Sequence, residues 1–182
     1  MRRTHNTARL IRKAAVVSIL LITCPAPHIH AFAPRRAEVA AAQRAVRSFF
    51  EFHFAHDMGF SQRSLSLRRR WLTPELYARL RAELLKEAKR AKAHPDEAPN
   101  INGDPFTDSQ LYPNTFRIGK AVHTGKRVEV AVTFVWTLDE GAFEMERTVT
   151  AFVAGRSGKW LINDIVGENG KGMLSNVPGP PD

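Results

Sequence analysis

The feature that most constrains the fold is the regular alternation of apolar and polar residues between positions 116 and 166. Four segments there place an apolar side chain at every second position, as half-buried strands do. Short polar turns at 123–126, 139–141 and 155–158 separate them. Because turns this short join antiparallel neighbours, the pattern predicts a four-stranded antiparallel meander with one apolar face. Trp136, Phe143, Val130 and Ile162 are predicted on that face, and Thr133, Thr137 and Glu144 on the other.

Helices are predicted ahead of the sheet. Residues 37–57 carry apolar side chains at three- and four-residue steps, and Gly59 follows. A second helix is predicted after Thr73, which suits an N-cap, with Pro74 at the first helical position. Residues 95–113 are rich in Pro, Asn, Asp and Gly and predict a long ordered loop. The fold class is therefore α+β, with two or three N-terminal helices packed on a curved, cone-like sheet.

The first 31 residues have the pattern of a secretory signal peptide. Basic residues precede an apolar run of about ten residues, half of the ~20 that span a bilayer, and small residues follow. We expect cleavage near residue 31, so that the mature chain begins near Phe32 or Pro34. The alternative is lipid attachment at Cys24, because residues 21–24 resemble a bacterial lipobox. The predicted division is a signal peptide over 1–31, a domain over 34–167 and a flexible tail over 168–182, in a periplasmic or secreted protein.

The predicted signal peptide accounts for much of the charge. The chain has 27 basic and 18 acidic residues and a formal charge of +9. Five basic residues and no acidic ones lie in 1–31, so the remainder carries +4. That is too mild to indicate a nucleic-acid partner. The basic patches at 68–70 and 86–92 are expected to be solvated, or else to contact anionic lipid or polymer of the envelope. Cys24 is the only cysteine, so the mature protein would have no disulfide.

Several short stretches in order resemble a known family. They are Phe-Phe-Glu-Phe at 49–52, Trp-Leu-Thr-Pro-Glu-Leu at 71–76, Gly-Asp-Pro-Phe at 103–106 with Gln110 and Tyr112, and Lys-Trp-Leu-Ile-Asn-Asp-Ile at 159–165. Together they resemble the bacterial secreted family called domain of unknown function 3828. That family lies in the nuclear-transport-factor-two-like, or cystatin-like, superfamily. The resemblance implies a cone-like α+β fold and a secreted location, and it implies no activity.

Four polar residues are candidates for a ligand-binding site. Lys120, Arg147 and Asp164 are in phase with the apolar strand positions, and His53 would approach from the helical side. Keeping apolar faces together predicts Val132 opposite Arg147 and Val149 opposite Asp164, which would bring Arg147 and Asp164 within reach of each other. They would then form a structural ion pair, anchor an anionic or polar ligand, or, with Asp164 or His53 as the acid or base, support catalysis.

Two further patterns resemble metal sites. His53 and His56 are three apart on one predicted helix, a spacing that can bind metal, but no third ligand is evident. Asn100, Asn102 and Asp104 alternate as in a calcium loop, but Pro105 stands where glycine is expected and no closing glutamate follows. We therefore predict that the protein binds no metal and no cofactor, and we assign no catalytic residue.

The sequence thus predicts a periplasmic or secreted non-catalytic domain that binds a small ligand or an envelope protein. The alternative is a small cofactor-free enzyme of the ketosteroid-isomerase type that uses a polar group in the cone. An interior filled by Trp and Phe side chains would argue against the enzyme. The identity of the ligand or partner, the formation of a homodimer and the presence of any activity stay open.

Overall fold

The computed structural model describes residues 32–97, 103–138, 143–167 and 170. The predicted signal peptide at 1–31, the predicted tail at 168–182 apart from residue 170, and two of the three calcium-loop residues lie outside the described residues. No helix in the described part is long and apolar enough to cross a membrane.

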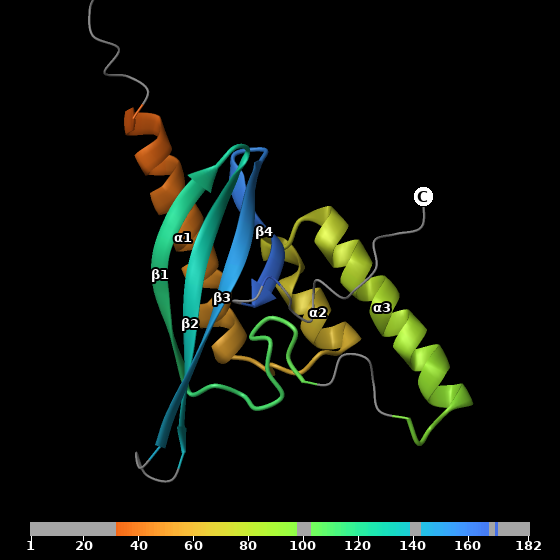
Figure 1. The fold of residues 1–182 in the computed structure, drawn as a ribbon. Coiled ribbons are helices and arrows are strands. Elements are labelled where there is room, and N and C mark those ends of the chain that lie inside the picture. Colours follow the sequence, from red (N-terminus) through yellow and green to blue (C-terminus); the bar gives the residue numbers. More distant parts are fainter. Residues whose placement is uncertain (1–31, 98–102, 139–142, 168–169, 171–182) are drawn as a thin grey trace, which may run out of the picture.

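Three helices pack on a four-stranded antiparallel sheet, as the sequence predicts (Figure 1). The strands follow the order β1-β2-β3-β4, so each is paired with its neighbour in the chain. Helix α1 lies across one face of the sheet and contacts every strand, while α2 and α3 lie on the side of β4. The elements are α1 (Phe32–Phe54), α2 (Gln62–Arg68), the 3₁₀ helix η2 (Arg69–Trp71), α3 (Pro74–Ala93), β1 (Thr115–Thr124), β2 (Arg127–Leu138), β3 (Phe143–Arg156) and β4 (Lys159–Gly167).

Local signals explain where the helices begin. Thr73 is the N-cap of α3, as predicted: its side-chain oxygen accepts a hydrogen bond from the backbone N–H of Leu76, with Pro74 in the first turn. Ser61 and Ser64 form a capping box at the start of α2. This helix occupies a segment whose polar, basic composition gave no clear helical period.

The segment between α2 and α3 is joined to the edge of the sheet. Leu72 forms a parallel bridge with Ile162 of β4, and the backbone N–H of Thr73 donates to the Ile162 carbonyl oxygen at 2.9 Å. Because this contact pairs part of the outer edge of β4, η2 and the start of α3 are held against the sheet.

The inner side of the sheet is filled by aromatic and branched side chains. The predicted inward residues Val130, Trp136 and Ile162 are each at most 2% exposed, and the predicted outward Thr137 and Glu144 are exposed. Aromatic residues from α1, the 103–111 segment and β2 meet there in edge-to-face contacts, which leave the inside of the cone packed. These buried aromatic residues are Phe49, Phe50, Phe106, Phe134 and Trp136.

Candidate functional site

The predicted pairing of Arg147 with Asp164 is wrong. Phe134, not Val132, lies opposite Arg147, and Phe152, not Val149, lies opposite Asp164. The two candidate residues sit on neighbouring strands, but Phe152, the partner of Asp164, is five positions along β3 from Arg147, which is about 17 Å. They therefore do not form one site.

A β-bulge in β4 is the physical reason for the error at Asp164. Phe152 pairs with Asp164 but Val153 pairs with Ile162, so Asn163 is an extra residue in β4. A bulge shifts the alternation by one, and Ile162 and Ile165 are the buried residues. Asp164 is only partly buried and forms an ion pair with Arg79 of α3 at 3.1 Å.

A second bulge displaces Lys120. Ile118 pairs with Val132 and Ala121 with Val130, so two residues of β1, Gly119 and Lys120, lie opposite one residue of β2. The expectation that Lys120 points inward is therefore wrong, and its side chain is exposed. Val122, which the same alternation also predicts to be inward, is 46% exposed.

His53 lies inside the molecule, on the helical side as predicted, but it is fully buried and has partners on both ring nitrogens. Its Nε2 is 2.7 Å from Asp104 Oδ2, and its Nδ1 accepts a hydrogen bond from Arg68 Nε at 2.7 Å. A guanidinium has no acceptor atom, so Nδ1 must carry the lone pair and Nε2 the hydrogen that is donated to Asp104. All three side chains are 0% exposed. We call these residues the buried polar triad.

Arg68 enters the triad at an electrostatic cost. Burial lowers the pKa of its guanidinium, and the carboxylates of Asp104 and Asp57 oppose that shift. The guanidinium also donates to the Ser64 and Asp57 carbonyl oxygens. Such a buried charge is tolerated because its donors are bonded and a carboxylate is near.

Asp104 fixes the segment 103–111 on this buried network. Its Oδ2 also accepts from the Thr107 hydroxyl at 2.8 Å, and its Oδ1 accepts from the Phe106 backbone N–H. The carboxylate thus has three donors, which tie the 103–111 segment to α1 and to its own backbone. Among the described residues, no group of three or more side chains is arranged to hold a metal ion.

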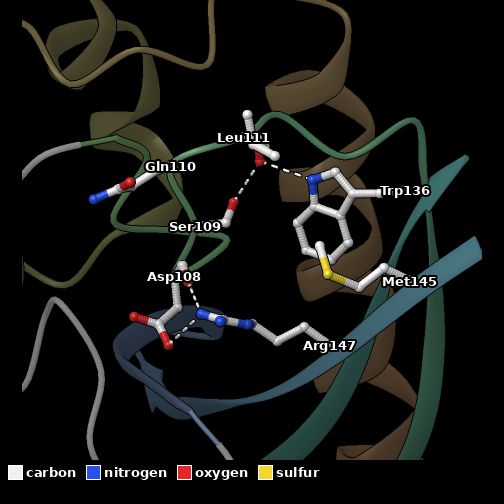
Figure 2. Close-up of a pocket in the computed structure, with 7 residues that line it drawn as sticks. All are labelled: Asp108, Ser109, Gln110, Leu111, Trp136, Met145 and Arg147. Carbon is white, nitrogen blue, oxygen red and sulfur yellow. Dashed lines mark hydrogen bonds and ion pairs between the residues drawn. The ribbon is translucent and has the colours of Figure 1, made fainter. Parts of the chain in front are cut away.

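The outer side of the same segment forms a pocket of about 400 Å³ with β2 and β3 (Figure 2). Arg147 Nη1 donates to the Asp108 carbonyl oxygen and lies 3.4 Å from Asp108 Oδ2. The indole N–H of Trp136 donates to the Leu111 carbonyl oxygen at 2.8 Å, and Met145 lies opposite Trp136 in the β2–β3 ladder. The pocket therefore has an aromatic wall, a thioether and a half-exposed guanidinium.

Large apolar side chains are exposed around this pocket. Leu111 is 60% exposed and Met145 38%, while the Arg147 side chain is 49% exposed. We call Leu111, Met145 and Arg147 the rim surface. Of the four predicted site residues, only Arg147 belongs to it.

The sequence interpretation missed Arg68 and the structural role of Asp104. The sequence pattern places Arg68 in a solvated basic patch and Asp104 in a calcium-like alternation. His53 shares a helix face with the apolar Phe49 and Phe50, and this spacing indicates that the imidazole is buried and needs a hydrogen-bond partner. Nothing local indicated that the partners would be Arg68 and Asp104, which are 15 and 51 residues away.

No family model matches the chain, and no characterised protein matches its sequence. Two solved structures of a type VI effector–immunity complex, Tae3–Tai3 from Ralstonia pickettii, are similar at 20% and 21% identity, with TM-scores of 0.47 and 0.46. The similarity covers 70% and 71% of this chain and 96% and 93% of the matched chains. A protein of unknown function from Bacteroides thetaiotaomicron is similar at 20% identity and a TM-score of 0.45, over 73% of this chain and 94% of that one. These similarities assign no role to any residue.

Proposed function

We propose that this chain is a secreted, non-catalytic binding domain that engages a protein partner through the rim surface. The observation that carries the proposal is the contrast between a packed interior and an exposed, mixed apolar and cationic rim. Met, Trp and Arg, which line the pocket, are residue types enriched at protein interfaces. Membership in the secreted family that the sequence resembles, and export directed by residues 1–31, are parts of this proposal.

The rigid support of the rim favours binding. Asp104 holds the inner side of the 103–111 segment, and Trp136 and Arg147 hold its outer side through the Leu111 and Asp108 carbonyl oxygens. A preorganised surface loses less conformational entropy when a partner binds. A partner side chain that enters the pocket would contact Trp136 and Met145 and lie beside the Arg147 guanidinium.

The enzyme alternative has less support from the geometry. The interior where an isomerase would hold its substrate is filled by Phe49, Phe106 and Phe134, all at most 2% exposed. His53 has both nitrogens bonded and no accessible surface, so it is not placed to exchange protons with a bound molecule.

A site-specific photocrosslinker tests the proposal in the native host compartment. We expect the group at Leu111 to give one discrete protein adduct, and the same group at Val122 to give none. Val122 is also exposed, and it lies opposite Glu129, about 23 Å along β2 from Trp136. The proposal is contradicted if the crosslinker gives the same protein adduct at both positions, or no adduct at Leu111.

Paired substitutions sharpen the result. Arg147→Ser with Met145→Ser should abolish the adduct, whereas Arg127→Ser with Val122→Ser at the other end of the sheet should leave it unchanged. Native mass spectrometry of the purified protein tests the competing hypothesis of a small ligand. A small molecule that stays bound to the protein and is lost in the Arg147→Ser, Met145→Ser variant would show that the pocket binds a small ligand instead of a protein partner.

A further inference from the structure

A second pocket, of about 270 Å³, lies where η2 and the start of α3 meet β4. Arg69, Arg70 and Lys159 line it, above an apolar floor that includes the buried Leu72 and the half-buried Leu161. None of the described residues that line it is acidic. We call this the cationic pocket, and it is separate from the rim surface.

In the part of the chain that the structure describes, the three cations have no carboxylate partner. Among the described residues, no Asp or Glu oxygen forms an ion pair with Arg69, Arg70 or Lys159, although Arg and Lys side chains elsewhere do form such pairs. The acidic residue next to this pocket in the chain, Glu75, is engaged by Arg156 at 2.9 Å. Three like charges are thus held around one hollow without internal compensation, an arrangement that repels itself unless an anion is present.

Aromatic rings fix the two guanidinium groups. Arg70 lies over the Trp71 ring at 3.9 Å and also contacts Phe52, and Arg69 lies over the Tyr77 ring at 5.2 Å. Stacking restrains a guanidinium while leaving its N–H donors free to turn toward a ligand. The arginine side chains are therefore partly preorganised, which reduces the entropy lost when an anion binds.

We propose that the cationic pocket binds a phosphoryl group. Guanidinium groups match phosphate oxygens bidentately, and a nearby ammonium adds a point charge, so two Arg and one Lys suit a tetrahedral oxyanion. The positive end of the α3 dipole, near Pro74, adds to the same potential. The apolar floor weakens screening by water and accommodates a carbon group attached to the phosphate. The phosphoryl group belongs either to a soluble phosphate ester or to a lipid headgroup.

The test follows the indole N–H signal of Trp71 by NMR, because this ring stacks against Arg70. The probe is glycerol 1-phosphate, titrated at constant ionic strength with sodium chloride as the replaced salt. We expect a saturable shift of the Trp71 signal and no shift of Trp136, which lies in the rim pocket. Absence of saturation, or equal shifts of both signals, overturns the proposal.

Matched charge variants separate the pocket from net charge. Arg69→Gln, Arg70→Gln and Lys159→Gln together should weaken binding about tenfold or more, because charge-assisted hydrogen bonds are lost. The control removes the same charge from three exposed cations elsewhere, and it should change binding by less than about twofold. Its changes are Arg36→Gln, Lys120→Gln and Lys126→Gln. Equal weakening in both triples overturns the proposal, and Lys159→Gln alone, which keeps both stacked arginines, should give a smaller loss in the same direction.

Vesicles distinguish the two sources of the phosphoryl group. Binding to phosphatidylglycerol vesicles but not to phosphatidylcholine vesicles, lost in the pocket triple and kept in the control triple, assigns a lipid headgroup. Response to glycerol 1-phosphate with no vesicle binding assigns a soluble ester. Vesicle binding that the pocket triple and the control triple weaken equally overturns the proposal, because a diffuse surface charge then explains it.

Discussion

The two sides of the 103–111 segment use aspartate and arginine in opposite ways. On the inner side, Asp104 bonds to His53, which in turn bonds to Arg68, and all three side chains are 0% exposed. On the outer side, Asp108 meets Arg147, and their side chains are 17% and 49% exposed. Water compensates a broken pair at the surface and cannot do so inside. The buried contacts of Asp104 should therefore contribute strongly to the free energy of unfolding. The Asp108–Arg147 pair should contribute little to it, so Arg147 can take part in binding a partner.

The most direct way to break this comparison is to make the same change on both sides. Asp104→Asn should lower the free energy of unfolding by about 3–5 kcal/mol, because it removes the carboxylate that contributes most to offsetting the burial of the Arg68 charge. Asp108→Asn should lower it by less than about 1 kcal/mol. Asparagine also suits the backbone at 108, where φ is 53°. Urea denaturation measures both, and equal losses would show that burial does not separate the two sides.

A double-mutant cycle sharpens the inner half of the comparison. Arg68→Met and Asp104→Asn should each destabilise strongly, but the second change should cost less after the first, with a coupling energy of about 1–3 kcal/mol. The reason is that both changes disrupt the same hydrogen-bonded unit through His53. Arg68→Met with Glu129→Gln, on the distant strand β2, is the control and should be additive. Additivity in both cycles would mean that the triad does not act as a unit.

The features that could be predicted from sequence are the local ones. Thr73 and Pro74 mark the start of α3, and alternation with short turns gives the meander, because both signals depend on residues close in the chain. The bulges at Asn163 and in β1 could not be predicted, since one extra residue changes the phase without a motif of its own.

The site could be predicted only in part, for a related reason. Arg147 was correctly placed in phase with the inner face, but its partner Asp108 comes from a loop whose path no periodicity specifies. Arg68 is adjacent to Arg69 and Arg70 in a run of like charges, yet it is buried and they are exposed. Composition alone treats the three arginines as one basic patch. The helical turn at the end of α2 directs Arg68 into the interior and Arg69 and Arg70 to the surface.

A partly buried pair tests whether burial, and not position in the loop, sets the strength of these ion pairs. Arg79 and Asp164 form an ion pair with side chains 21% and 25% exposed. Arg79→Met and Asp164→Asn should show a coupling energy of about 0.5–1 kcal/mol in denaturation experiments. Arg147→Met with Asp164→Asn should be additive, because these residues have separate partners. A coupling between Arg147 and Asp164 would restore the pairing that the sheet register excludes.

The smallest effects are expected at β1, where the bulge at Gly119 and Lys120 turns side chains fully outward. Lys120→Met should change the free energy of unfolding by less than about 0.5 kcal/mol, since the side chain contacts mainly solvent. Val122→Ala should be similarly mild, because Val122 is 46% exposed. The matched control is Val130→Ala on the inner face, where the valine is 0% exposed and its loss should cost about 2 kcal/mol or more. If Val122→Ala were as costly as Val130→Ala, the alternation in β1 would run through position 122 without a bulge. Lys120 would then point inward together with Ile118 and Val122, and the ranking by burial would fail at the edge strand.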